Sequence, residues 1–294
     1  MSFAKGMIWK NYILTVSSMS RKKRRNILLI VEGEKAEVKL FTKIAECFPQ
    51  MGYSRENIIV YKTNLWVLSG ELKKYFGSDW YEQREIDMLG FIRSCEKFKD
   101  QAVKLEGKRI TDIYLVFDYE RQDIRFNAGD IENMQNFFCE STRNGMLYIN
   151  YPMVEAYKHL KKPLPDEDFI DRACKCSELS EYKEIVDSES GQNDLRRLNT
   201  EDFKKLVIHN LCKAACMTGE DASRQLKCIS EEAAYKYHIR CDLFSILKKQ
   251  LGCSASTETG FVYVLATCLF FIPDYNPELI FDNETIGKVK AEMI

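Results

Sequence analysis

The chain has 294 residues, which is enough for one large domain or two smaller ones with a proper hydrophobic core. Its 45% hydrophobic and 30% charged residues are typical of a soluble globular protein. A net charge of −1 provides no overall attraction to nucleic acid, so any polyanion binding must depend on local patches.

The N-terminal segment 1–25 is interpreted as a basic extension ahead of the folded protein. Lys10 and Asn11 interrupt its apolar stretch and no small-residue cleavage pattern follows, so the sequence does not predict a signal peptide. Both Met1 and Met19 remain open as the natural start. The basic run at its end is either a nucleic-acid contact or a solvated lead-in to the first strand; it comprises Arg21, Lys22, Lys23, Arg24 and Arg25.

The eleven cysteines are scattered and no pair has CxxC spacing. They are interpreted as reduced, mostly buried thiols, which fits a cytoplasmic protein. A zinc site assembled from distant cysteines is the alternative.

Residues 26–150 alternate short aliphatic segments with segments of helical periodicity. Continuous apolar strands separated by helices predict an α/β domain, residues 26–162, with a parallel sheet covered on both faces. The expected strands are 26–31, 57–62, 112–117 and 146–150. The expected helices are 35–48, 66–76, 81–104 and 130–142.

After Pro152 the pattern changes, and residues 163–294 are expected to form a mostly helical C-terminal region. Thr200 and Asp202 are expected to cap the helix that follows the polar stretch 188–200. The apolar run 261–272 is too short to cross a bilayer and predicts a core element or an oligomer interface. The expected helices are 167–174, 177–186, 200–217 and 230–249, with a last buried element at 261–271.

Acidic residues follow two of the expected strands. Glu32 comes directly after the first strand, and Asp118 and Glu120 follow the third. Functional groups of open parallel sheets gather beyond the carboxyl ends of the strands, and residues two apart in an extended chain project the same way. If the two strands are neighbours, the three carboxylates converge and repel one another unless a cation offsets their charge. The sequence therefore predicts a Mg²⁺ or Mn²⁺ site with Glu32 as a ligand or an acid–base group.

Three further acids have two interpretations each. Glu34 and Glu37 are either outer ligands of a second ion or residues favoured at a helix N-terminus by the macrodipole. Asp123 either assists the site or forms loop ion pairs with the neighbouring arginines. Gly33 is expected to keep the loop after Glu32 thin, so that a phosphate backbone can approach.

The segment VEGEKAE after an aliphatic strand, followed by a strand that ends in an acid-x-acid pair, resembles the TOPRIM domain. Within that fold, VEGEKAE together with YINYPMVEAY resembles the RloB branch, which is related to the overcoming-lysogenization-defect nucleases. The resemblance covers about residues 26–160. It implies a Rossmann-like sheet, magnesium-dependent cleavage of phosphodiester bonds and a role in anti-phage defence.

The resemblance also implies roles for individual residues. Glu32 would be the motif glutamate, Asp118 and Glu120 the paired acids, and Glu155 the later glutamate that holds metal in the RloB-like pattern. Lys35 would offset charge on the phosphate at the transition state, unless it is an ordinary lysine of the helix surface. The pair here is DxE where TOPRIM domains usually have DxD.

A second departure lies in the first motif. Many relatives carry an acid at the position that Ala36 occupies here, and Glu37 follows it. With these departures, one ion and two ions are both open alternatives. His159 lies one turn after Glu155, and the two are either a ligand and its partner or a surface ion pair.

The first functional hypothesis is a metal-dependent nuclease that cuts DNA or RNA. The chain has no GxxxxGK[ST] loop, so the resemblance implies a separate ABC- or SMC-like ATPase as its controlling partner. The alternative is a catalytically reduced TOPRIM-like adaptor of such an ATPase complex. A third hypothesis is a protein that binds a small phosphorylated ligand, and the missing glycine-rich loop after the first strand counts against it. Self-association and the absence of a membrane partner are further expectations.

Overall fold

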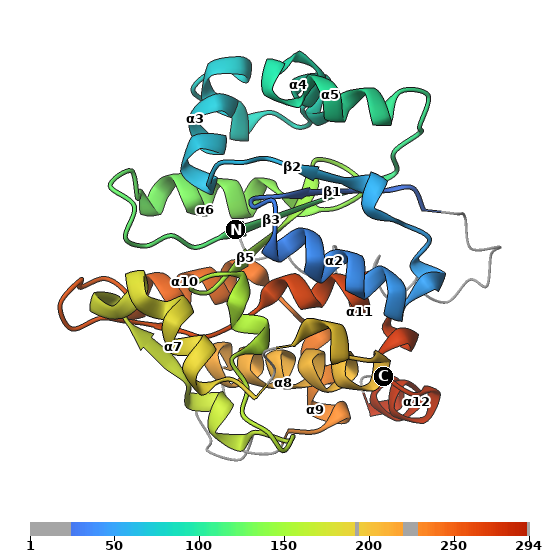
Figure 1. Cartoon of the computed structure of the whole chain (residues 1–294), viewed down its shortest axis with the longest axis vertical. Helices are drawn as coiled ribbons and strands as arrows, with labels where there is room; N and C mark the ends of the chain where they lie inside the picture. The colour runs from blue at the N-terminus through green and yellow to red at the C-terminus, as the bar shows by residue number, and fades with distance from the viewer. Residues whose placement is uncertain (1–24, 192–193, 220–228, 293–294) are drawn as a thin grey trace.

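The computed structural model describes residues 25–191, 194–219 and 229–292. Its central element is a five-stranded sheet in the order β2-β1-β3-β5-β4 (Figure 1). Strands β2, β1, β3 and β5 are parallel, and β4 pairs antiparallel with β5. The strands are β1 (Ile27–Val31), β2 (Ile58–Val60), β3 (Asp112–Asp118), β4 (Cys139–Glu140) and β5 (Gly145–Asn150). All five residues of β1 are buried, as expected for a central strand covered on both faces.

Helices cover both faces of this sheet (Figure 1). On one face lie α3, α4 and α5, and Phe137 of α6 contacts Trp80 in the segment between α3 and α4. On the other face lies α2, with the C-terminal region packed beneath it. These helices are α2 (Ala36–Cys47), α3 (Leu65–Phe76), α4 (Met88–Ser94), α5 (Lys99–Ala102) and α6 (Ala128–Phe137).

The four parallel strands confirm the predicted α/β sheet, but one predicted helix is wrong. Residues 81–104 do not form a single helix, because Cys95 adopts an extended backbone with ψ 114° and ends α4. The segment continues as short helical turns on either side of α5. The helix predicted at 130–142 likewise ends at Phe137, and the next residues form the edge strand β4.

The C-terminal region is mostly helical, with a small sheet of two antiparallel strands, β6 and β7. Its α-helices are α7 (Tyr182–Glu189), α8 (Thr200–Thr218), α9 (Glu231–His238), α10 (Leu243–Cys253), α11 (Phe271–Tyr275) and α12 (Asn283–Glu292). The strands are β6 (Ala173–Lys175) and β7 (Phe261–Tyr263). No helix among the described residues is long and apolar enough to span a membrane.

Several predicted boundaries in this region need correction. The helix expected at 167–174 is a 3₁₀ helix, Glu167–Asp171, followed by β6. The helix expected at 230–249 is divided into α9 and α10, because the Asp242 side chain caps a new helix by accepting from the Phe244 amide at 3.0 Å. Asn199, and not Thr200, caps α8, in a capping box with Asp202. The run 261–272 is core: Leu265 and Leu269 are fully buried within the chain.

Sheet and C-terminal region share one hydrophobic core. Alternate residues of β3 point to opposite faces, so Tyr114 contacts Phe271 of α11 while Phe117 contacts Tyr61 on the other side. Tyr151, which follows β5, exchanges backbone hydrogen bonds of 2.7 and 2.9 Å with Leu265. The side chain of Asp118 therefore projects toward the face that the C-terminal region covers.

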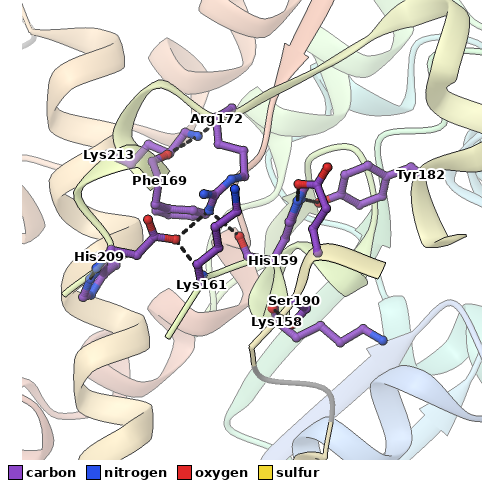
Figure 2. Close-up of polar contacts among 11 residues, drawn as sticks. Lys158, His159, Lys161, Phe169, Arg172, Tyr182, Ser190, His209 and Lys213 are labelled. Atoms are coloured by element: carbon purple, nitrogen blue, oxygen red, sulfur yellow. Dashed lines mark hydrogen bonds and ion pairs between the residues drawn. The ribbon is translucent and has the colours of Figure 1, made fainter. Parts of the chain in front are cut away.

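A buried polar cluster connects the loop after β5 to α8 (Figure 2). Arg172 donates to the Asp166 carboxylate at 2.7 Å and to the His159 carbonyl at 2.8 Å. The ammonium of Lys213, a fully buried side chain of α8, donates to the backbone carbonyls of Phe169 and Arg172. Because every charged group has a partner, the cluster fixes this loop on α8.

Asp166→Asn is expected to lower the free energy of unfolding by about 3–5 kcal/mol, because it leaves the Arg172 guanidinium buried without its anionic partner. Urea unfolding followed by circular dichroism measures the change. The matched control is Glu178→Gln, which removes an exposed ion pair with Lys175 and is expected to cost less than about 1 kcal/mol. Equal losses in the two variants would contradict this assignment.

Candidate functional site

Glu32 and Asp118 meet at the carboxyl edge of the sheet. Strands β1 and β3 are parallel neighbours with Val31 beside Val116. Glu32 follows β1 directly, and its Oε2 accepts a hydrogen bond from the Asp118 backbone amide at 3.0 Å. Strand β2 lies on the other side of β1, so the strand order reverses at this point, where open α/β sheets bind ligands. The predicted convergence of the two acids is confirmed.

Glu37 belongs to the same group of acids. It occupies a position on the buried face of α2, in register with Leu40, Phe41 and Ile44, and is only 4% exposed. Its Oε1 accepts from the Gly33 amide at 3.0 Å, which closes the loop between β1 and α2. A Cβ at position 33 would lie 2.7 Å from Glu37 Oε2, so a larger residue there would displace this carboxylate. Gly33 therefore makes room for Glu37.

Glu155 approaches from the loop after β5. It lies in the 3₁₀ helix Val154–Lys158, is 7% exposed, and forms an ion pair of 3.7 Å with Lys183 of α7. Burial is the main cause of the raised pKa values of Asp118 and Glu37, and the charge of Glu155 adds to both. Strands β1 and β3, the loop after β5 and helix α2 thus each contribute one carboxylate to the cluster Glu32, Glu37, Asp118 and Glu155.

Glu120 does not project beside Asp118 from an extended strand, as the sequence predicts. Strand β3 ends at Asp118, and Glu120 has a positive φ of 44°, so the alternation of an extended strand does not continue to it. Between them, the Tyr119 side chain turns into the core and its hydroxyl pairs with Ser254 Oγ at 2.9 Å. Glu120 Oε2 accepts from Asn64 at 3.2 Å, and its charge raises the pKa of Glu32.

The clustered carboxylates resist ionisation. Burial raises the pKa of Glu32 from 4.5 to about 8; the hydrogen bond from Asp118 opposes this rise, and the charges of Glu120 and Glu37 add to it. Burial and the charge of Glu32 raise the pKa of Asp118 well above its ordinary value. Burial also raises the pKa of Glu37. Within the described residues, no lysine or arginine forms an ion pair with Glu32 or Asp118.

Glu34 and Asp123 each form an ion pair with a basic side chain. Glu34 is exposed and pairs with Lys62 at 2.7 Å, an interaction that lowers the pKa of Glu34. Asp123 pairs with Arg125 at 2.6 Å, and this hydrogen bond lowers the pKa of Asp123. The pairing of Asp123 corresponds to its ion-pair interpretation, whereas the pairing of Glu34 with Lys62 is neither of the two interpretations offered for Glu34.

Glu32 and Glu37 line an open pocket of about 590 Å³, and Lys35 and Lys183 line it as well. Lys35 is exposed at the start of α2. Asp118 lies behind Glu32 and does not line the pocket. A ligand that enters this pocket would therefore meet the Glu32 carboxylate before that of Asp118.

The donor set suits a hard divalent cation. Asp118 Oδ1 is inaccessible to solvent and makes no hydrogen bond, which is costly for a carboxylate oxygen that has no cation beside it. In the described part of the chain, no three His, Cys, Asp or Glu side chains are arranged as the ligands of one metal ion. Mg²⁺ is commonly held by one or two carboxylates, with water and substrate phosphate completing its shell, so this cluster is chemically adequate.

Sequence reasoning missed Lys183, which comes from α7 in the C-terminal region and carries no motif. The predicted pairing of His159 with Glu155 is wrong, because His159 contacts Glu189 at 3.2 Å and the Tyr182 hydroxyl at 3.1 Å. Of the basic run, Arg21 to Arg24 lie outside the described residues. Arg25 lies over the Tyr275 ring at 5.2 Å, at the amino end of β1 and therefore at the opposite edge of the sheet from Glu32.

Three of the described cysteines are buried: Cys174, Cys212 and Cys268. No family model, curated protein or solved structure matches this chain.

Proposed function

We propose that this protein is a metal-dependent nuclease that cleaves phosphodiester bonds at the Glu32–Asp118 cluster. The observation that carries the proposal is that Glu32 and Asp118 lie at the ends of neighbouring strands, where the Glu32 carboxylate accepts from the Asp118 backbone amide and Asp118 Oδ1 has no hydrogen-bond partner. Packing like charges together costs folding free energy, and such perturbed groups concentrate at functional sites.

Mg²⁺ or Mn²⁺ is the cation that fits this chemistry, because both prefer hard oxygen ligands. Glu32 and Asp118 would hold the ion, with Glu37 and Glu155 completing the negative field around it. When bound, such an ion activates water and stabilises the charge that develops on the leaving oxygen.

Two lysines would orient the substrate. Lys35 and Lys183 line the pocket, where their ammonium groups favour a phosphate over a neutral ligand. In the metal-free protein burial raises the pKa of Glu32 to about 8, so Glu32 would release a proton when it binds the ion.

The proposed fold family is TOPRIM, from the resemblance of VEGEKAE and YINYPMVEAY. A parallel sheet with acids after β1 and β3 supports it. Control by a partner ATPase and a role in anti-phage defence extend the proposal and rest on that resemblance alone.

Incubation with plasmid DNA, single-stranded DNA and RNA tests the proposal. We expect cleavage of at least one substrate with Mg²⁺ or Mn²⁺, and none when the metal is chelated. Intact substrates under all of these conditions would contradict the nuclease assignment and favour a binding module that serves a partner protein.

A further inference from the structure

A second open groove adjoins the carboxylate pocket. Its volume is about 930 Å³, and it runs along the exposed side of α2. The opposite wall is made by the C-terminal half of the chain and includes Lys158, Lys183 and Arg196. Lys35 and Lys183 line both the groove and the carboxylate pocket, and Glu155 also lines the groove, so the two spaces lie next to each other.

The groove is positively charged although the chain as a whole is not. Six cationic side chains line it against three carboxylates, whereas the whole protein has a net charge of −1. Three of the six cations pair with those carboxylates, at distances of 3.7 Å or less, and a fourth, Lys158, pairs with Asp187 at 2.6 Å. Lys35 and Lys39 are exposed and form no ion pair within the described residues. The groove therefore has spare positive charge for an anionic ligand.

The lysines of α2 form a regular row. Lys35, Lys39 and Lys43 are spaced four residues apart and therefore project from one face of the helix. The rise along α2 between successive lysines is about 6 Å. This spacing is close to that of successive phosphates in an extended nucleic-acid strand. Val38, Tyr157 and Leu195 give the groove an apolar part on which bases can lie.

We propose that this groove, lined by α2 on one side and by Lys158, Lys183 and Arg196 on the other, binds the backbone of a single nucleic-acid strand and leads it to the carboxylate cluster. This inference deepens the proposed nuclease function and rests on it for the role of the bound strand. A single strand fits better than a duplex, because the two walls enclose a volume that holds only a few nucleotides.

Fluorescence anisotropy of a labelled short oligothymidylate tests the groove, in EDTA so that binding is measured without cleavage. The double variant Lys39→Glu and Lys43→Glu is expected to bind at least about tenfold more weakly than the wild type, with a salt dependence reduced by about two counterions. Hydrolysis of thymidine 5′-(p-nitrophenyl phosphate), which is too small to occupy the groove, is expected to be unchanged in this variant.

The matched control is Lys99→Glu with Lys108→Glu, which changes the net charge equally at exposed positions outside the groove. It is expected to bind like the wild type. An equal loss in control and groove variants, or no binding of oligothymidylate by the wild type, would overturn the proposal. Equal or tighter binding of duplex would overturn the preference for a single strand, and full displacement by a mononucleotide would indicate a small phosphorylated ligand instead.

These results separate the two proposals. Binding that depends on the groove lysines, without any cleavage, would support the proposed strand-binding groove and contradict the proposed nuclease function. Cleavage by the wild type and the groove variant at equal rates and with equal affinities would support the nuclease function and contradict the strand-binding groove.

Discussion

Asp118→Asn is expected to abolish metal-dependent cleavage while making the metal-free protein more stable. The substitution removes a cation ligand, which is worth several kcal/mol at the transition state, or a loss of about a thousandfold in rate. It also removes a buried acid whose ionisation is opposed by burial and by the charges of Glu32, Glu37 and Glu155. We expect the free energy of unfolding at neutral pH to rise by about 1–2 kcal/mol. Cleavage kinetics and urea unfolding of the same preparation measure the two effects.

Glu32→Gln is expected to behave in the same way, because Glu32 provides the second carboxylate of the site, next to Asp118. Glu34→Gln is the matched control: it makes the same chemical change two residues away, but on an exposed side chain that pairs with Lys62. We expect it to retain most of the activity and the original stability. A loss of activity accompanied by a loss of stability in Asp118→Asn would indicate a structural role and contradict the assignment.

The metal-free protein is expected to lose stability as the pH rises from about 5 to about 8. Glu32 has an ordinary pKa of 4.5 when unfolded and a pKa of about 8 when folded. Between these values the folded state keeps a proton that the unfolded state has released, so raising the pH favours unfolding. Below this window both states are protonated, and above it the loss is complete. Allowing for partial exposure of the side chain, we expect a fall of about 2 kcal/mol.

Divalent cations should remove this dependence, because they bind the ionised carboxylates of the folded state only. Thermal unfolding across the pH range, with and without Mn²⁺, provides the measurement. The double variant Glu32→Gln with Asp118→Asn lacks both acids, so its pH profile measures the contribution of all other titrating groups. The difference between this profile and that of the wild type is the contribution of the cluster. Identical pH profiles for the wild type and this variant would show that the cluster does not titrate as described.

The sequence predicted the edge of the sheet at which the site lies. Five consecutive buried aliphatic residues specify β1, and an acid directly after such a strand must emerge at its carboxyl end. The adjacency of β1 and β3 was conditional, because strand order depends on long-range packing that local pattern does not encode. Once the two strands pair, the positions of Glu32 and Asp118 follow.

The C-terminal contribution to the site could not be predicted. Strand β6 pairs with β7 across nearly ninety residues of chain, with Cys174 beside Val262, so each of these short strands lacks a local signal. Lys183 reaches Glu155 only because α7 packs beside the loop after β5. Glu37 occupies an apolar position of α2, and its burial becomes visible only when the neighbouring carboxylates are in place.

Calorimetric titration of Mn²⁺ into the metal-free protein determines whether Glu32 and Asp118 form a metal site. We expect saturable binding with release of protons near neutral pH, because Glu32 must ionise to hold the cation. We also expect that binding is lost in Asp118→Asn and kept in Glu34→Gln. Absence of binding by the wild type at millimolar Mn²⁺, or unchanged binding by Asp118→Asn, would contradict the proposed metal site.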